Sequence, residues 1–282
     1  MQPFEYYAPH SLPEALTVLA DYGGAARVIA GGTDLLLKLK AGRIAPPAVV
    51  NLKRLPALRG QTVNSHVTLG ALTTLTDLHA SPQLRARLPS VAAAAGTMAS
   101  VQIRNLATLG GNLCNAAPSA DLAPILIALE AVGLIAGPQG EREAPLEDFF
   151  TGPGQTALLP GELLTAVRIA PAAGPSTYLK LAPRACMDIA VVGVGLALQL
   201  EGERCRRARI VLGAVGPTPR RARRAEDVLL GERLTPERIA QAADLAAEAA
   251  QPIDDVRGSA WYRRRMVTTL TRRGLLALAE AA

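Results

Sequence analysis

Two pairs of adjacent glycines constrain this chain more than any other feature. The first stands in VIAGGTDL, residues 28–35, and the second in TLGGN, residues 108–112. Glycine lets the backbone turn tightly, or lets a ligand approach until several N–H groups point at one spot. A phosphate is the natural ligand for such a spot, and a tight turn without any ligand is the simpler alternative. Each of these two pairs follows an apolar stretch and precedes a small polar residue, which makes a bound ligand as good an interpretation as a plain turn.

Other nucleotide-binding signatures do not fit. No G-x-x-x-x-G-K-[ST] occurs, which argues against a Walker-type loop. Gly193 and Gly195 in VVGVGLAL imitate the start of G-x-G-x-x-G, but Leu198 holds the third glycine position and the run continues as an alternating strand. We interpret these glycines as close strand packing or a bulge, and a Rossmann dehydrogenase is not expected.

Composition places the chain among folded globular proteins. It has 282 residues, of which 49% are hydrophobic and only 3% aromatic. That length suits one large domain or two to three smaller ones. The net charge is +6, with arginines clustered in residues 219–226 and 262–274. A nucleic-acid surface is one interpretation of these clusters. We favour a solvated or subunit-facing helix, because no nucleic-acid motif accompanies the charge and few aromatics are available for base stacking.

Neither a metal site nor a catalytic residue is expected in this chain. The three cysteines are far apart and form no C-x-x-C: Cys114, Cys186 and Cys205. The histidines lack ligand-spaced partners: His10, His66 and His79. A disulfide framework, a zinc site and an iron–sulfur cluster are therefore not expected. Because glycine loops occur without an acid–base cluster, a bound cofactor is expected to carry the chemistry.

The order of elements predicts an α+β fold. Strands and helices alternate up to a proline-rich segment, Pro171–Pro175, which is a candidate domain boundary. Three strand-like runs and then three helical runs follow, which predicts helices packed on one face of an antiparallel sheet. Predicted helix caps are Ser11, Thr33 or Asp34, Ser119 and Thr235.

The N-terminus lacks a basic segment followed by an apolar core, and no apolar stretch of 18 residues occurs. A cytoplasmic location without a membrane span is expected.

The two glycine segments also carry a resemblance. VIAGGTDLLLKLK, followed by QIRNLATLGGNLCNAAPSADLAPILIAL, resembles the FAD-binding medium subunit of molybdenum hydroxylases of the xanthine dehydrogenase and carbon monoxide dehydrogenase type. YLKLAPRACMDIAVVGV and LGAVGPTPRRARRAE resemble the C-terminal domain of that family. The resemblance implies a two-lobed FAD-binding domain of the PCMH, or vanillyl-alcohol-oxidase-like, type over residues 1–170. A small domain of antiparallel sheet plus helices is implied over residues 176–282.

The resemblance further implies an electron-transfer function. FAD would be bound in this chain, without a covalent bond. Its electrons would come from [2Fe–2S] clusters on a small partner subunit, supplied by a molybdopterin cofactor on a large partner subunit. The flavin would pass them to NAD⁺, a quinone or dioxygen. A dimer of heterotrimers is the implied assembly. The alternative is a stand-alone flavin oxidase on the same fold, which would need a base or aromatic cage over the flavin, and none is found in the sequence.

Finally, the resemblance implies cofactor contacts. The first segment would wrap the FAD pyrophosphate and adjoining ribityl chain: Val28, Ile29, Ala30, Gly31, Gly32, Thr33, Asp34 and Leu35. The facing segment would be Thr108, Leu109, Gly110, Gly111 and Asn112, with backbone donors from the two glycines. Asp121 and Leu164 match further contacts, and Lys180 matches a lysine close to the ring that could stabilise reduced flavin. Met98 stands where related members have an aromatic residue.

Overall fold

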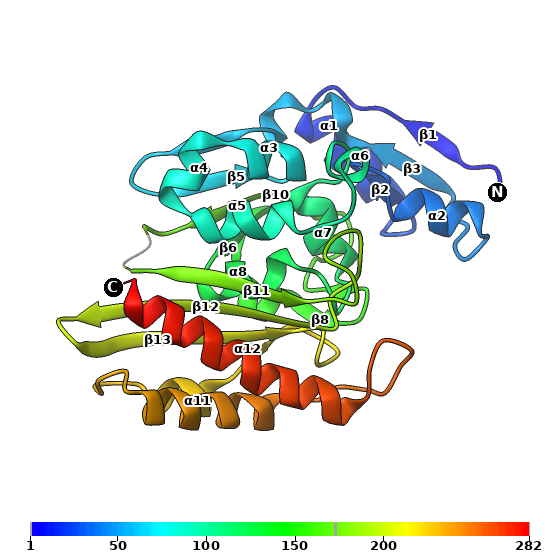
Figure 1. The fold of residues 1–282 in the computed structure, drawn as a ribbon. Helices are drawn as coiled ribbons and strands as arrows, with labels where there is room; N and C mark the ends of the chain where they lie inside the picture. The colour runs from blue at the N-terminus through cyan, green and yellow to red at the C-terminus, as the bar shows by residue number, and fades with distance from the viewer. Residues whose placement is uncertain (1, 172–173, 282) are drawn as a thin grey trace.

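The chain forms three successive α+β lobes, each built around its own sheet. The computed structural model describes residues 2–171 and 174–281. In Figure 1 the chain runs from the N-terminal lobe at the upper right, through the helix-rich middle lobe, to the C-terminal sheet with its helices at the bottom. Because the sheets contain parallel and antiparallel pairs and the helices cluster between and outside them, the predicted α+β class is confirmed.

The N-terminal lobe is a three-stranded sheet in the order β1-β3-β2, with parallel neighbours. Its strands are β1 (Glu5–Tyr7), β2 (Arg27–Ile29) and β3 (Ala48–Asn51), joined by α1 (Leu12–Asp21) and α2 (Leu35–Lys40). Ser11 caps α1 as predicted, by accepting a hydrogen bond from the Glu14 N–H. Asp34 occupies the N-cap position of α2, but its side chain makes no capping hydrogen bond.

The middle lobe is a five-stranded antiparallel sheet in the order β4-β5-β10-β6-β7. The strands are β4 (Gln61–Val63), β5 (Val67–Gly70), β6 (Val132–Gly137), β7 (Gly140–Pro145) and β10 (Leu163–Ile169). The helices are α3 (Leu75–Ala80), α4 (Pro82–Arg87), α5 (Pro89–Gly96), α6 (Val101–Arg104), α7 (Leu109–Asn115), α8 (Leu122–Ala128) and α9 (Leu146–Phe149). A small hairpin, β8 (Phe150–Gly152) and β9 (Gln155–Thr156), completes this lobe.

The predicted cap Ser119 is wrong. Helix α8 begins at Leu122 with Asp121 at its N-cap position, and the Asp121 side chain makes no capping bond. The carboxylate is instead hydrogen-bonded to two side chains of the C-terminal sheet. The Asp121 side chain therefore serves a tertiary contact and not a helix cap, and sequence near the helix cannot show such a contact.

The C-terminal lobe is a four-stranded antiparallel sheet in the order β11-β12-β13-β14. Its strands are β11 (Ser176–Leu181), β12 (Val192–Glu201), β13 (Arg204–Gly213) and β14 (Arg220–Arg221), and its helices are α10 (Arg223–Asp227), α11 (Pro236–Ala249) and α12 (Ala260–Glu280). Thr235 caps α11 as predicted. The predicted boundary Pro171–Pro175 includes residues 172 and 173, which lie outside the described residues.

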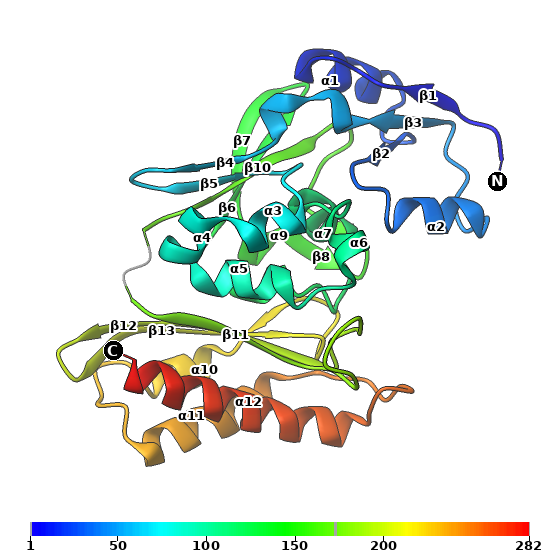
Figure 2. The ribbon, with the colours of Figure 1, turned by 45° about the horizontal axis from the view of Figure 1, so that its top comes forward.

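Both faces of this sheet are covered, although helices on one face only were predicted. Figure 2 shows β11, β12 and β13 as a layer between α5 above and α10, α11 and α12 below. The second face packs on α5 and α8 of the middle lobe. On that face a Cβ added at Gly195 or Gly213 would overlap Pro124 of α8. The interpretation of the β12 glycines as close strand packing is therefore confirmed at Gly195.

Candidate functional site

The first glycine segment joins β2 to α2 and carries unpaired backbone donors. Gly32 has φ +80°, a left-handed conformation that favours glycine. Among the described residues, the N–H groups of residues 31–34 have no hydrogen-bond acceptor. Several free N–H groups in one turn ahead of a helix form a concave site for an anion. This segment can therefore bind a phosphate through its backbone.

The second glycine segment is the first turn of helix α7, and its donors are already used. Thr108 is the N-cap and accepts a hydrogen bond from the Gly111 N–H at 3.0 Å. The N–H of Leu109 donates to Thr73, that of Gly110 to Ala71, and that of Asn112 to Thr108. The N–H groups of Gly110 and Gly111, which were expected to donate to the cofactor, thus both have acceptors within the chain at the start of α7.

The two positions of the TLGGN pair differ in how strictly packing requires glycine. A Cβ on Gly110 would fall 2.8 Å from the Ala71 Cβ and 2.9 Å from the Ala71 carbonyl oxygen, so helix α7 requires glycine there to pack on the strand-end segment. A Cβ on Gly111 would approach only the Thr108 hydroxyl, at 2.9 Å. Packing alone therefore explains Gly110 and leaves the face of Gly111 open.

The two segments meet across the junction of the first two lobes. A Cβ on Gly31 would overlap the carbonyl oxygen of Leu106, just before the second segment. Lys38 of α2 donates to Asn115 of α7 at 2.8 Å. One turn earlier on α7, the buried Asn112 Oδ1 has no hydrogen-bond partner within residues 2–171 and 174–281. A buried amide oxygen without a partner usually indicates a missing water or ligand, so the junction fits a polar cofactor.

A buried ion pair joins the middle lobe to the C-terminal sheet. Lys180 Nζ lies 2.9 Å from Asp121 Oδ2, and each side chain is less than a tenth exposed. Tyr178, which the sequence analysis missed, donates to Asp121 Oδ1 at 2.7 Å. Burial raises the pKa of Asp121 above its ordinary value, and the Lys180 charge and the two hydrogen bonds oppose that rise. Burial also raises the pKa of Tyr178, so the phenol stays protonated and remains a donor.

Met98 and Leu164, two further expected cofactor contacts, both pack in the middle lobe. The ammonium of Lys180 also donates to the Thr97 carbonyl at 3.3 Å, which places the residue next to Met98 in contact with the pair. Met98 is partly buried against the core of the middle lobe. Leu164 of β10 is fully inside that core, where its side chain is the nearest neighbour that a Cβ on Gly133 would meet. Its side chain therefore serves packing.

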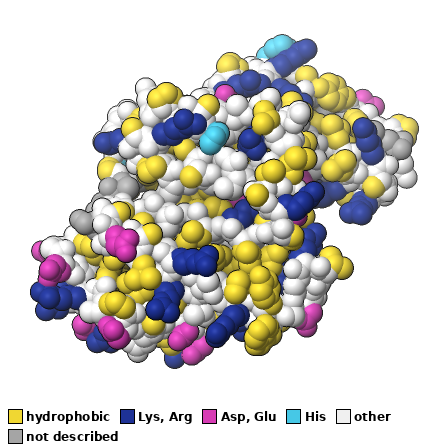
Figure 3. Space-filling view, in the orientation of Figure 1, with side chains coloured by type: hydrophobic (Ala, Val, Ile, Leu, Met, Phe, Trp, Pro, Cys, Tyr) yellow, Lys and Arg dark blue, Asp and Glu magenta, His cyan; other side chains and the backbone are white. Residues whose placement is uncertain are grey.

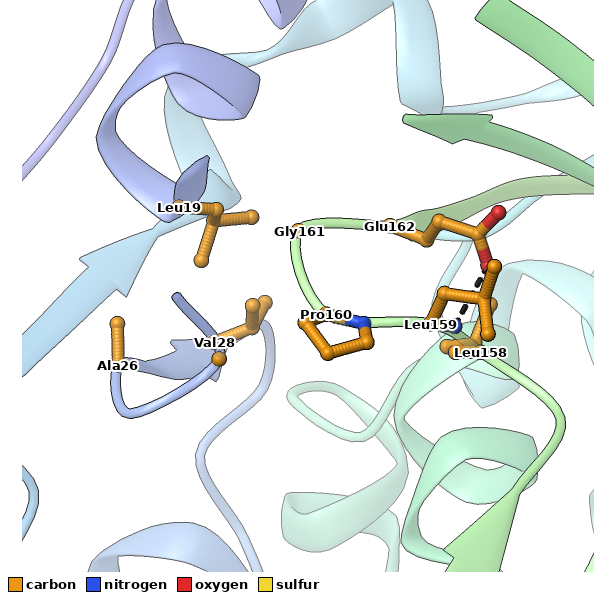
Figure 4. Close-up of a pocket in the computed structure, with 9 residues that line it drawn as sticks. Leu19, Ala26, Val28, Leu158, Leu159, Pro160, Gly161 and Glu162 are labelled. Carbon is orange, nitrogen blue, oxygen red and sulfur yellow. Dashed lines mark hydrogen bonds between the residues drawn. The ribbon is translucent and has the colours of Figure 1, made fainter. Parts of the chain in front are cut away.

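A cleft of about 260 Å³ lies beside the start of the first segment. Figure 4 shows Leu19, Ala26 and Val28 on one side and residues 158–162 on the other. Its walls are largely aliphatic, and Glu162 is held by Arg142 and by the Leu159 N–H. Residues 158–162 immediately precede β10. The cleft therefore lies between Val28 of the first segment and the residues that lead into β10, the strand that contains Leu164.

Some of the late arginines form ion pairs, and others have no carboxylate partner among the described residues. In the run at residues 219–226, Arg221 pairs with Glu147 and Glu226, and Arg223 also pairs with Glu147. Along α12, Arg263 is buried, pairs with Asp255 and donates to backbone carbonyls, whereas Arg264, Arg265, Arg272 and Arg273 are exposed. Figure 3 shows Lys and Arg side chains separated by other residues over the lower half of the molecule. Much of the basic charge thus serves ion pairs within the fold.

Metal and membrane features are absent from the part of the chain that the structure describes. No group of three His, Cys, Asp or Glu side chains there could hold a metal ion. No described helix is long and apolar enough to cross a membrane. Cys114 of α7 is partly buried, and desolvation raises the pKa of its thiol to about 12. Such a thiol is protonated at neutral pH and is a poor nucleophile.

Comparison with known families agrees with this geometry. Residues 2–172 match the model of the FAD binding domain in molybdopterin dehydrogenase. Residues 177–278 match that of the CO dehydrogenase flavoprotein C-terminal domain. The fold and the site thus define a flavin-binding oxidoreductase chain. It belongs to the family of FAD-binding medium subunits of molybdenum hydroxylases of the CO dehydrogenase and xanthine dehydrogenase type.

Individual relatives cover almost the whole chain. The carbon monoxide dehydrogenase medium chain of Hydrogenophaga pseudoflava is 36% identical over 276 residues, 96% of each chain. The putative xanthine dehydrogenase FAD-binding subunit of Escherichia coli is 32% identical and covers 98% of this chain and 96% of its own. Among solved structures, quinoline 2-oxidoreductase from Pseudomonas putida has a TM-score of 0.93 at 33% identity, covering 100% of this chain and 98% of its own.

Proposed function

We propose that this chain binds FAD at the junction of its three lobes and conducts electrons from a partner subunit to an external acceptor. Family membership establishes a FAD-binding subunit, and the position of the cofactor is our inference. The observation that carries it is the set of unpaired N–H groups at residues 31–34, next to the unpartnered Asn112 Oδ1. The N–H groups are donors for the phosphate oxygens of a dinucleotide, and Asn112 Oδ1 is an acceptor for one of its donor groups.

Different parts of the chain would hold different parts of FAD. The backbone of residues 28–35 would bind the pyrophosphate, and Asn112 would bind a neighbouring polar group. The aliphatic cleft beside Val28 would receive the apolar faces of the adenine. The Asp121–Lys180 ion pair would lie at the flavin end. Met98 would lie near it, because the neighbouring Thr97 accepts a hydrogen bond from Lys180. Bound FAD supplies reversible transfer of two electrons in one- or two-electron steps.

The residues of this chain then have two tasks. The free N–H groups neutralise phosphate charge, which fixes the cofactor without a metal ion. The Lys180 ammonium supplies positive charge near the flavin, which favours the reduced, negatively charged form. No described side chain is required to exchange a proton with an organic substrate, because that reaction belongs to another subunit.

The partners follow from the family. We propose a small subunit with [2Fe–2S] clusters as the electron donor and a large molybdopterin subunit as the site of substrate oxidation, assembled as a dimer of heterotrimers. The acceptor is NAD⁺, a quinone or dioxygen. The relatives are named as medium chains or FAD-binding subunits, which supports a multi-subunit enzyme over a stand-alone oxidase.

Purification of the tagged chain from its native host tests this function. We expect stoichiometric FAD, together with an iron–sulfur and a molybdenum-containing subunit. Chain released from the complex should retain FAD and contain no iron. Adding NAD⁺, a quinone or dioxygen to the substrate-reduced complex then identifies the acceptor by the rate of flavin reoxidation. A chain that purifies alone and oxidises an organic substrate would contradict the proposal.

A further inference from the structure

The buried carboxylate of Asp121 accepts hydrogen bonds from two side chains of a single strand. Tyr178 OH lies 2.7 Å from Oδ1, and Lys180 Nζ lies 2.9 Å from Oδ2. We propose that Tyr178 is a positioning residue for the flavin. Tyr178 hydrogen-bonds to Asp121, and Asp121 pairs with the Lys180 ammonium. Together the three groups determine the electrostatic potential at the flavin. This inference rests on the proposed function, in which Asp121 and Lys180 lie beside the flavin.

The alternation of β11 brings Tyr178 and Lys180 to the same carboxylate. Residues two apart on a strand face the same side, so both point toward the middle lobe. Leu179 between them faces the other way, where its Cδ1 would meet a Cβ on Gly274 of α12. The register with β12 pairs Lys180 with Gly193 and Tyr178 with Gly195. Both donors are therefore fixed by the sheet.

The neighbouring glycine gives the Tyr178 hydroxyl its position. A Cβ on Gly193 would fall 2.6 Å from Tyr178 OH. Alanine at this position would displace the hydroxyl, which is the far end of a movable side chain, and would leave the backbone in place. The two glycines of VVGVG thus have separate tasks. The missing side chain at Gly195 lets helix α8 pack close to the strand, and the missing side chain at Gly193 leaves space for the Tyr178 hydroxyl that binds Asp121.

The physical effect on the flavin is electrostatic. Charges in a buried site interact strongly because solvent screens them little. The Tyr178 O–H dipole points its positive end at the Asp121 carboxylate and neutralises part of its field. Without this dipole, the carboxylate presents a more negative potential to its surroundings. Reduced flavin, which carries added negative charge, becomes less favourable, and the reduction potential falls.

The test is the midpoint potential of FAD bound to the full chain. We expect Tyr178→Phe and Gly193→Ala to lower the potential while FAD remains bound. Lys180→Met should also lower it and serves as the reference for a charge change at the site. Tyr7→Phe is the matched control. This variant loses the 3.0 Å hydrogen bond between the hydroxyls of Tyr7 and Tyr22 in the N-terminal lobe. It should leave the flavin potential unchanged.

The variants separate failure of this inference from failure of the proposed site. A lowered potential in Lys180→Met with wild-type potentials in Tyr178→Phe and Gly193→Ala would show that Tyr178 is only structural. Unchanged potentials in all three would show that the ion pair does not face the flavin at all. Gly193→Ala keeps the experiment decisive if Tyr178→Phe does not fold.

Discussion

Gly195 of β12 lies directly against the peptide group of Pro124 in α8. A Cβ on Gly195 would fall 2.5 Å from both the carbonyl carbon and the carbonyl oxygen of Pro124. This contact packs the C-terminal sheet against α8, the helix that directly follows Asp121. The same interface carries the buried Asp121–Lys180 pair, so its spacing fixes the proposed flavin site.

The first prediction concerns this contact. Gly195→Ala should destabilise the chain by about 1–3 kcal/mol, because backbone atoms cannot move aside as a side chain can. Unfolding in urea, followed by circular dichroism, measures the loss. Gly193→Ala on the same strand face is the control and should lose less, since its Cβ would meet the hydroxyl and ring edge of Tyr178, which belong to a side chain and not to the backbone. Equal stability of Gly195→Ala and wild type would show that the two lobes are not tightly packed.

The second prediction concerns the free donors of the first segment. Thr33→Pro removes one unpaired N–H, whereas Thr33→Ala removes the side chain and keeps that N–H. A hydrogen bond to a charged group contributes about 1.5–3 kcal/mol, so proline should weaken FAD binding by roughly tenfold or more relative to alanine. Titration of FAD into the apoprotein, followed by flavin fluorescence, gives both dissociation constants. Equal affinities would exclude the Thr33 N–H as a phosphate ligand.

The third prediction distinguishes the glycines of the second segment. Gly110→Val should prevent normal folding, because its side chain would overlap Ala71. Gly111→Val should still fold, with about 1 kcal/mol less free energy of unfolding because the valine disturbs the Thr108 cap. It should bind much less FAD, because the valine would fill the face that Gly111 leaves open. The flavin-to-protein ratio of the folded fraction measures this binding. Leu113→Ile is the control and should keep its cofactor. A Gly111→Val chain loaded like wild type would mean that the second segment only starts a helix.

The fourth prediction is a pH dependence. The hydrogen bonds from Arg142 hold the pKa of Glu162 below its ordinary value of 4.5. A carboxyl with a lowered folded-state pKa stabilises the fold above its unfolded pKa, and this stability is lost as the pH falls through the folded pKa. The melting temperature of Glu162→Gln should therefore lie below that of wild type at pH 7, and the difference should shrink below about pH 4. A difference that is constant from pH 7 to pH 3 would exclude this pair as the cause.

The fifth prediction concerns cofactor attachment. FAD should be released into the supernatant when the protein is precipitated with acid, because we expect no covalent bond to a side chain. Absorbance of the supernatant and of the redissolved pellet measures the partition. Colour that stays with the pellet would point to Cys114, which lies in α7 beside the second segment.

The sequence by itself determined the class of the protein. Local signals were enough for the caps at Ser11 and Thr235, since each depends on atoms within one helical turn. The order and spacing of the glycine segments led to the family, which the matches over residues 2–172 and 177–278 confirm. The α+β class followed from the three strand-like runs and the three helical runs after them in the C-terminal part of the chain. All of these properties depend on neighbours in sequence.

Only the tertiary structure decided what each candidate residue does. The same Gly-Gly pattern leaves unpaired donors at residues 31–34 and a fully bonded helix start at residues 109–112, because Thr73 and Ala71 supply acceptors to the second segment alone. Asp121 forms no cap because its carboxylate is bound by Tyr178 and Lys180, more than fifty residues away along the chain. Partners so distant in sequence leave no local signal, and burial by two packed lobes is what makes their contact strong.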